Sequence, residues 1–286
     1  MINPKSHDSL FKWLITAFTR EFFGHYFPNI QIGNYTFIDK EFISKYESLK
    51  ESLKGDLFLV MEVEIDGVLQ EIVIQIEHQS EKVNISKRVY EYSCYAWLLR
   101  NKPVWSIVIY TDDAVWRKPV VGQFWYAFDS QKGKQYHYFD VIKVKAEKSS
   151  ELIAKHSLMC KLLALKANDR KTDPEKLVYE IYRAVALMKN KLTNEQLLLI
   201  DQWVSFYKKV PEQKLEKIKK EIKMDFIETT ITEHVYNQGW IEGETKGEVK
   251  GRKETAVNLL NMGIDVGIIS QATGFNEKEI KQLTAL

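Results

Sequence analysis

The clearest alternation of apolar and polar positions lies in residues 55–80, where two apolar runs flank Asp66-Gly67. Asp-Gly in a two-residue loop is typical of a type I′ turn, so the pattern predicts a β-hairpin. If these two residues form the loop, Ile65 faces Val68 and the rest of the register follows. One face is then expected to be core, because it carries Leu57, Leu59, Met61 and Val63 opposite Ile76, Ile74, Ile72 and Gln70.

The second face of the hairpin places Asp56 directly opposite Glu77, with Gln79 two residues further along. Opposed residues have Cβ atoms about 4.5–5.5 Å apart, and like charges there are destabilising. Such a pair is either solvated or neutralised by a cation, and a hard divalent ion such as Mg2+ suits two carboxylates. The register alone leaves both readings open. Glu62 faces Glu71 near the turn, where solvated charge is the simpler expectation.

The chain before the hairpin predicts a helix and a short strand. Apolar residues recur at three- and four-residue spacing over 6–23, with Ser6 as a suitable N-cap. Gly24 and Pro28 are expected to end this helix. A short edge strand is expected within 34–43.

The chain after the hairpin continues with a helix and a strand. Residues 84–100 have a helical pattern that Asn101-Lys102-Pro103 stops. Residues 104–113 form a continuous apolar run of the kind buried on both faces of a sheet. Strand, helix and strand joined in this way give a βαβ crossover, so the sheet is expected to be mixed. An aromatic-rich loop or irregular hairpin over 114–135 and a further strand over 135–144 follow.

After residue 150 the pattern becomes helical throughout. Asp173-Pro174 marks a helix start, and Thr193 with Gln196 forms a capping box. The final residues, 254–286, resemble a helix-turn-helix in outline. The segments with helical spacing are 151–167, 174–189, 194–209 and 211–230.

Composition argues against a disordered chain, a disulfide-bonded chain and a membrane-spanning chain. The chain has 286 residues, 45% of them hydrophobic, and a formal charge of +2, so it can form a large core and any nucleic-acid site needs a local basic arrangement. Cys94 and Cys160 stand far apart and outside metal-ligand spacing, which favours reduced core thiols. No apolar run approaches a membrane span, and the start lacks a signal peptide pattern. We expect a soluble, cytoplasmic protein.

The order of elements and a set of short motifs resemble the PD-(D/E)xK nuclease superfamily. More narrowly, the chain resembles the recombination-promoting nuclease family, also called the YhgA-like transposase family, over most of its length. The matching residues are His7-Asp8 and Phe11-Lys12, Gly55-Asp56-Leu57, Ile76-Glu77-His78-Gln79-Ser80, Arg88 and Tyr92, and the Gly-rich tail at 239–253.

The resemblance implies an αβββαβ restriction-endonuclease-like core and a role for individual residues. Asp56 and Glu77 would be metal ligands for Mg2+ or Mn2+, and Gln79 stands where the family has Lys. A neutral amide is no base at pH 7, so water activation would fall mainly on the ion, and Gln79 would orient that water or a phosphate oxygen.

Three further residues are candidates for accessory roles. Asp8 and Lys12 are one helical turn apart. Asp8 would be a further metal ligand and Lys12 a phosphate contact, or the two would form an ordinary surface ion pair. Arg88 would hold the scissile phosphate or neutralise the site. His78 falls on the core side of the hairpin, which favours a structural role. The aromatic residues of 116–126 either stack bases or cover the core.

Glycines at fixed spacing of four mark the tail at Gly239, Gly243, Gly247 and Gly251. Glycine inside a helix costs about 1 kcal/mol relative to Ala, so the spacing favours a helix whose small face meets another backbone. The alternative is a flexible charged connector. The many charged residues between the glycines exclude a membrane span.

These patterns together predict a nuclease core over 1–150, a helical region over 151–230, and a Gly-repeat helix with a small helical tail over 231–286. The expected function is metal-dependent hydrolysis of DNA phosphodiester bonds by a homodimer, linked to recombination, mobile elements or defence. The alternative is a nuclease fold without turnover that serves as a DNA- or protein-binding module.

Overall fold

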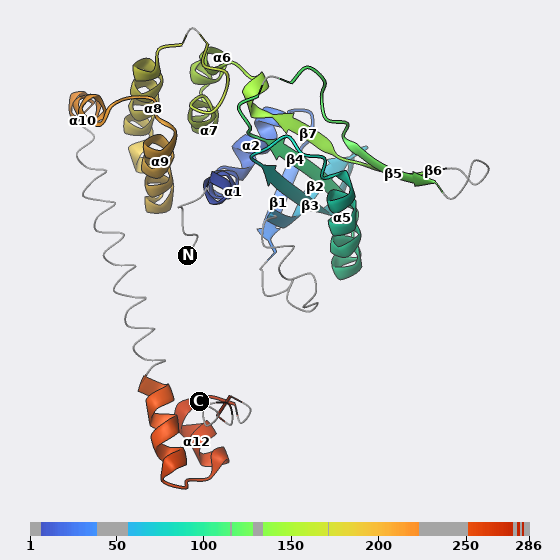
Figure 1. The fold of residues 1–286 in the computed structure, drawn as a ribbon, viewed down its shortest axis with the longest axis vertical. Helices are drawn as coiled ribbons and strands as arrows, with labels where there is room; N and C mark the ends of the chain where they lie inside the picture. Colours follow the sequence, from blue (N-terminus) through green and yellow to red (C-terminus); the bar gives the residue numbers. More distant parts are fainter. Residues whose placement is uncertain are drawn as a thin grey trace. The chain divides into compact units, whose positions relative to one another are not determined.

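The computed structural model describes residues 7–38, 57–114, 116–127, 134–170, 172–222, 251–276, 279–280 and 282. The chain divides into two compact units, Met1–Asp225 and Phe226–Leu286. The first unit contains a mixed sheet with helices (Figure 1). In the described part of the chain no helix has the length and apolar character needed to cross a membrane.

Five strands form the main sheet in the order β1-β2-β3-β4-β7. The first three pair antiparallel, whereas β4 and β7 continue parallel to β3, which confirms the expected mixed sheet and βαβ crossover. A separate two-stranded ribbon, β5-β6, projects beside it (Figure 1). The strands are β1 (Ile32–Phe37), β2 (Leu57–Ile65), β3 (Val68–Gln79), β4 (Val104–Tyr110), β5 (Gln123–Ala127), β6 (Lys134–Tyr138) and β7 (Asp140–Lys143).

The hairpin register is confirmed from turn to end. Ile65 pairs with Val68, and Leu57 pairs with Ile76. Asp66 and Gly67 have φ of 52° and 76°, the two positive values that a type I′ turn needs. The apolar face is core as expected: Leu59, Met61, Val63, Ile72, Ile74 and Ile76 are buried. Asp56, the residue expected opposite Glu77, lies outside the described residues.

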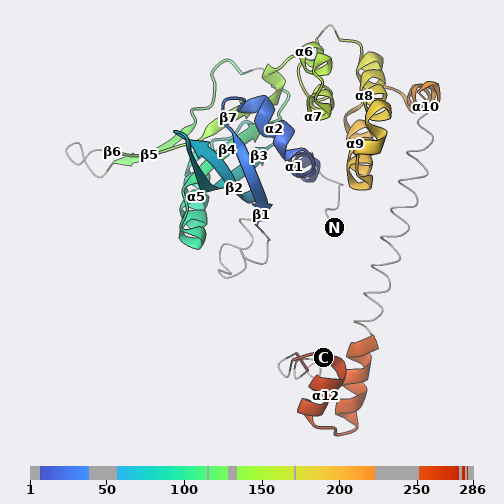
Figure 2. The ribbon, with the colours of Figure 1, turned by 180° about the vertical axis from the view of Figure 1, so that it is seen from behind.

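Helices cover both faces of this sheet (Figure 2). Helix α5 (Ser86–Arg100) packs on the face that carries Phe58 and Val73, with which its Tyr92, Tyr95 and Ala96 form one buried cluster. Helix α1 (His7–Ala17) contacts β3 on the other face, where Phe11 stacks on His78 at 4.7 Å between ring centroids. Successive strand residues point to opposite faces, so neighbours in the sequence of β3 face different helices.

Two of the elements predicted before residue 150 are each split by the structure. The helix expected over 6–23 is α1 followed by α2 (Thr19–Tyr26), with a break at Phe18, and Gly24 lies inside α2 instead of ending the helix. The strand expected over 135–144 is β6 and β7, which belong to different sheets and separate at Phe139. The edge strand is confirmed as β1, although it begins two residues before the predicted range.

The helical segment after residue 148 packs on α1. Trp203 of α9 donates its indole N–H to the Leu162 carbonyl at 2.8 Å and makes an edge contact with Phe11. The capping box of Thr193 and Gln196 is confirmed. The helix predicted over 151–167 is two short helices instead. The helices here are α6 (Ser149–Ala154), α7 (Leu158–Leu163), α8 (Pro174–Met188), α9 (Asn194–Tyr207) and α10 (Glu212–Glu221).

The second unit has a small apolar core of its own. Residues 251–261 are helical, and α12 (Val266–Thr273) follows after a short turn, with Asp265 as its N-cap. Ala256, Ile269 and Ile280 form the buried cluster. Of the four glycines in the predicted stripe only Gly251 is described; Gly239, Gly243 and Gly247 lie outside the described residues.

Candidate functional site

A buried carboxylate lies near the carboxyl end of β3. Glu77 is 3% exposed and points to the α5 face of the sheet. Its Oε1 accepts hydrogen bonds from Gln79 Nε2 at 2.7 Å and from Arg88 Nη2. Its Oε2 is also buried but has no hydrogen-bond partner among the described residues. An unpaired buried carboxylate oxygen is costly, so this atom marks a place for a donor or a cation.

The start of α5 brings Arg88 to this carboxylate. Asn84 Oδ1 accepts a hydrogen bond from the Ser86 backbone N–H at 3.0 Å, which shapes the turn into the helix. Arg88 lies in the first turn, and its side chain remains 41% exposed. The guanidinium therefore reaches Glu77 from the solvent side. Sequence reasoning expected Arg88 near the site, and the structure pairs it directly with Glu77.

Gln79 lies beside Glu77 on the same face. Its Nε2 donates both to Glu77 and to the backbone carbonyl of His78, at 2.9 Å. Among the described residues both hydrogen bonds of this side chain use Nε2, so there the amide oxygen remains available as an oxygen ligand or a hydrogen-bond acceptor. The oxygens of Glu77 and Gln79 are hard donors of the kind that Mg2+ prefers.

Tyr110 is the neighbour of Gln79 on β4. Its hydroxyl donates to the Val83 carbonyl at 2.8 Å, in the loop that leads into α5. Burial and, after it, the negative charge of Glu77 raise the pKa of Tyr110 to about 12. The phenol therefore stays neutral at physiological pH and fixes the loop beside the carboxylate. Sequence reasoning did not single out Tyr110.

Asp8 and Lys12 lie on the other face of the sheet. They form the expected i,i+4 ion pair, and Asp8 Oδ1 also contacts His78 Nδ1 at 3.1 Å. Burial raises the pKa of Asp8, but the hydrogen bonds from His78 and Lys12 outweigh it and hold that pKa below its ordinary value. Because His78 and Glu77 are adjacent in β3, their side chains point apart. The structure therefore places Asp8 and Lys12 with His78 and away from the contacts of Glu77.

His78 completes a buried chain of contacts on that face. Its Nε2 lies 2.9 Å from Thr111 Oγ1, the first residue after β4. Its orientation toward the core side agrees with the predicted structural role. Thr111 was missed, although a hydroxyl directly after a buried apolar strand is a signal that could have identified it.

The donors for a metal ion are in part present. In the described residues no group of three or more His, Cys, Asp or Glu side chains could hold one. Glu77 Oε2 and the Gln79 amide oxygen are oxygen donors of the type that a divalent cation takes, and Asp56, the third expected donor, lies outside the described residues. The two donors that the structure describes therefore suit a divalent cation by their chemistry.

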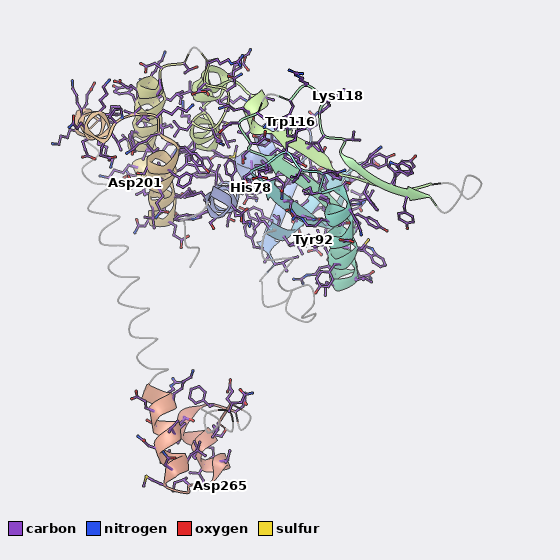
Figure 3. The ribbon with its side chains drawn as sticks, in the orientation of Figure 1. His78, Tyr92, Trp116, Lys118, Asp201 and Asp265 are labelled. Atoms are coloured by element: carbon purple, nitrogen blue, oxygen red, sulfur yellow. The ribbon has the colours of Figure 1, made fainter. Side chains whose placement is uncertain are left out.

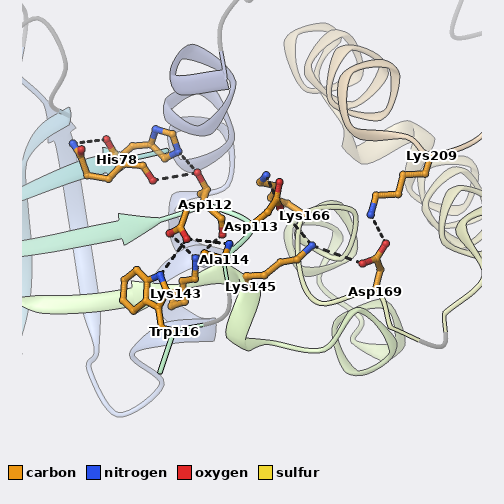
Figure 4. A network of polar contacts seen from close by, with 12 residues as sticks. His78, Asp112, Asp113, Ala114, Trp116, Lys143, Lys145, Lys166, Asp169 and Lys209 are labelled. Atoms are coloured by element: carbon orange, nitrogen blue, oxygen red, sulfur yellow. Dashed lines mark hydrogen bonds and ion pairs between the residues drawn. The ribbon is translucent and has the colours of Figure 1, made fainter. Parts of the chain in front are cut away.

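A second polar network lies at the ends of β4 and β7 (Figure 4). Asp112 accepts hydrogen bonds from the Trp116 indole N–H at 3.1 Å and pairs with Lys143 at 2.5 Å. Asp113 pairs with Lys166 at 3.1 Å. This network holds the loop after β4 against the end of β7. Sequence reasoning did not identify it, because its members are distant in the chain.

Comparison with family models, curated proteins and solved structures finds no match to this chain. The geometry of the side chains is therefore the basis for assigning a function.

Proposed function

We propose that the chain is a metal-dependent nuclease that hydrolyses phosphodiester bonds of DNA, with Glu77 as the central metal ligand. The observation that carries the proposal is the buried Oε2 of Glu77 beside Gln79, an atom that has no hydrogen-bond partner among the described residues. The element order supports it, because helix, strand, hairpin, helix and parallel strand is the order of the αβββαβ restriction-endonuclease-like core.

The residues around Glu77 have separate roles in this proposal. Glu77 and Asp56 hold the cation, Mg2+ or Mn2+. Gln79 uses its amide oxygen to orient the attacking water or the cation, while Nε2 fixes the Glu77 carboxylate. Arg88, half exposed beside the carboxylate, is placed to hold a phosphate oxygen of the substrate. Bound at this position, the cation lowers the pKa of water and neutralises charge on the phosphate.

The proposed active form is a two-fold dimer. Two copies related in this way present two sites to the two antiparallel strands of a DNA duplex. The Gly-repeat segment is the proposed contact, and its small face would let two helix backbones approach closely.

One observation favours a second candidate, a nuclease fold without turnover that binds DNA or protein. The Glu77 charge is already paired with Arg88, and Gln79 replaces the cationic residue of a nuclease site. A carboxylate that holds an internal arginine has less need for a metal ion.

Cleavage of supercoiled DNA by the purified chain in Mg2+ or in EDTA separates the two candidates. The parent should nick DNA in Mg2+ and not in EDTA, and Glu77→Gln should lose this activity. Gln79→Ala should lower turnover more than DNA affinity, and Gln79→Lys should retain turnover. Affinities are compared at one salt concentration, because phosphate contacts depend on salt. A parent that binds DNA without cleaving it would replace the enzyme proposal by the binding module.

A further inference from the structure

A cavity of about 520 Å³ lies where the loop after β4 meets the end of β7. Its wall is apolar on the side of the loop and β7, and cationic side chains line the rest. None of the lining residues is acidic. They are Ala114, Trp116, Pro119, Val120, Val141, Lys143, Lys145, Ala146, Asn168 and Arg170.

Of the three cationic side chains at this cavity, Lys145 and Arg170 are available to an anionic ligand, whereas Lys143 is not. Lys143 is committed to Asp112 at 2.5 Å. Within the described residues the ion pairs of Lys145 are both long, at 3.5 Å to Asp113 and 3.7 Å to Asp169. Both of those carboxylates have closer lysine partners elsewhere, at 3.1 Å and 2.5 Å (Figure 4).

Arg170 is exposed at the same cavity. Its guanidinium has no ion pair to any carboxylate in the described residues. An exposed guanidinium without a carboxylate partner can take a phosphate through two parallel N–H donors. Lys145 and Arg170 therefore supply two positive charges that the protein does not neutralise closely.

The Trp116 ring in the cavity wall contacts several neighbouring side chains. The Trp116 ring has Lys82 Nζ 4.8 Å and Lys143 Nζ 4.7 Å from its centroid, and its edge contacts Tyr110. Figure 3 shows Trp116 and Lys118 together beside β7. Lys82 also lines a second cavity of about 520 Å³, and Val120 lines both, so the two cavities adjoin.

The strand register connects this cavity with Glu77. Glu77, Val108 and Val141 form one row across β3, β4 and β7, and Gln79, Tyr110 and Lys143 form the next. Residues in one row of a sheet share a face, and neighbouring strands are about 4.8 Å apart. The cavity therefore lies on the Glu77 face, two strands or roughly 10 Å away, which is about three base-pair steps of B-DNA.

We infer that this cavity binds a nucleotide of the DNA strand that is cleaved at Glu77, with its phosphate on Lys145 and Arg170. The sugar and base lie against the apolar wall formed by Val120, Val141 and Ala146. This inference rests on the proposed function and gives its substrate a second point of attachment. The cavity fixes the register of the DNA strand relative to Glu77. Lys145 and Arg170 are therefore positioning residues.

Binding of a fluorescein-labelled DNA duplex to the full chain in EDTA tests this assignment without cleavage. The variants are Lys145→Gln with Arg170→Gln, and as a matched control Lys176→Gln with Arg183→Gln, which removes the same charge from the exposed side of α8. The first pair should weaken binding about tenfold. It should also lower the slope of log affinity against log salt by about 1.8, because each phosphate contact contributes about 0.9. The control pair should match the parent in slope.

Cleavage by the same proteins in Mg2+, with Glu77→Gln included, separates this inference from the proposed function. If binding depends on Lys145 and Arg170 while the parent cleaves nothing, the cavity assignment stands and the nuclease proposal fails. If cleavage depends on Glu77 but the Lys145 and Arg170 pair binds like the control pair, the cavity assignment is overturned. Arg170→Gln alone, an exposed change, guards against a folding defect and should give about half of the slope change.

Inorganic phosphate at matched ionic strength tests the other source of a phosphate ligand. It should compete with the duplex only weakly, because it cannot use the apolar wall. Saturable phosphate binding that needs Lys145 and Arg170 and equals the duplex in affinity would overturn the assignment to DNA.

Discussion

Opposed carboxylates in the β2–β3 hairpin find partners outside the hairpin. Glu71 pairs with Lys102 at 2.7 Å, and Glu62 accepts the Asn34 backbone N–H at 2.8 Å. Both contacts are exposed and the Glu71 side chain remains 53% exposed, so the expected solvated charge at this pair is compatible with the partners that β1 and the residues before β4 supply. Glu77 likewise has a partner outside the hairpin, Arg88, but one of its buried oxygens has no hydrogen-bond partner in the part of the chain that the structure describes. That remaining oxygen distinguishes a candidate cation site from an ordinary ion pair.

Asp8 should contribute to stability in a pH-dependent way. Its pKa in the folded chain is below the ordinary value of 3.8. The carboxyl therefore stabilises the fold above pH 3.8, and this contribution disappears as the pH falls through the lowered pKa. Asp8→Asn should reduce the free energy of unfolding at pH 6, with a difference from the parent that shrinks below about pH 4.

Urea unfolding of both proteins between pH 2.5 and 7 measures this difference. A difference that stays constant across the range would contradict the contacts with His78 and Lys12. Metal-dependent cleavage should survive in Asp8→Asn, because Asp8 contacts the residue on the opposite face from Glu77.

The sequence predicted individual residues well where neighbours in the hairpin determine their surroundings. The predicted register places Gln75 on the same face of β3 as Glu77, and the structure buries its amide there, with Ser106 Oγ donating to it at 2.9 Å. The contact of Asp8 with His78 joins residues 70 positions apart and depends on how α1 docks. No local spacing contains that information.

At the scale of elements, a local sequence signal predicted the β2–β3 hairpin, but no local signal predicted where α1 and α2, or β6 and β7, separate. Asp66-Gly67 and strict alternation determine the register together. The break at Phe18 lies inside a continuous apolar pattern, because both α1 and α2 bury the same kind of face. The separation of β6 from β7 at Phe139 likewise follows from different pairing partners, which alternation along one chain does not reveal.

Two glycine substitutions test the elements with opposite expected signs. Gly67 has φ of +76°, which an L residue adopts only with strain, so Gly67→Ala should destabilise by about 1 kcal/mol. Gly24 is exposed inside α2 with open space around it, so Gly24→Ala should stabilise by up to about 1 kcal/mol. Chemical denaturation measures the change in the free energy of unfolding for each variant. A Gly67→Ala protein as stable as the parent would argue against the type I′ turn.

At the scale of the whole molecule, the described chain contains two compact units with separate cores. The first carries every described candidate for chemistry. At Gly251, the described member of the glycine stripe, an added Cβ would meet no atom of the described residues within 4 Å. Among the described residues, the helix surface is therefore open at this glycine.

Replacement of Gly243 and Gly247 by Leu tests the proposed dimer. If two helix backbones meet there, the added bulk should outweigh the gain in helix propensity of about 1 kcal/mol per site. The variant should then associate less and lose double-strand cleavage more than nicking. Sedimentation velocity compares it with the parent, and a parent that is monomeric at working concentration would end the pairing hypothesis.

The central claim is that Glu77 holds a divalent cation, and thermal unfolding with Mg2+ or EDTA tests it most directly. A ligand at 100 times its dissociation constant stabilises the folded state by about 2.7 kcal/mol. For a unit of this size the melting temperature of the parent should rise by roughly 5–10 °C. Arg88→Gln removes the competing guanidinium and should show a larger rise, whereas Glu77→Gln should show none. An equal rise in the parent and in Glu77→Gln, or no rise in Arg88→Gln, would contradict the cation site.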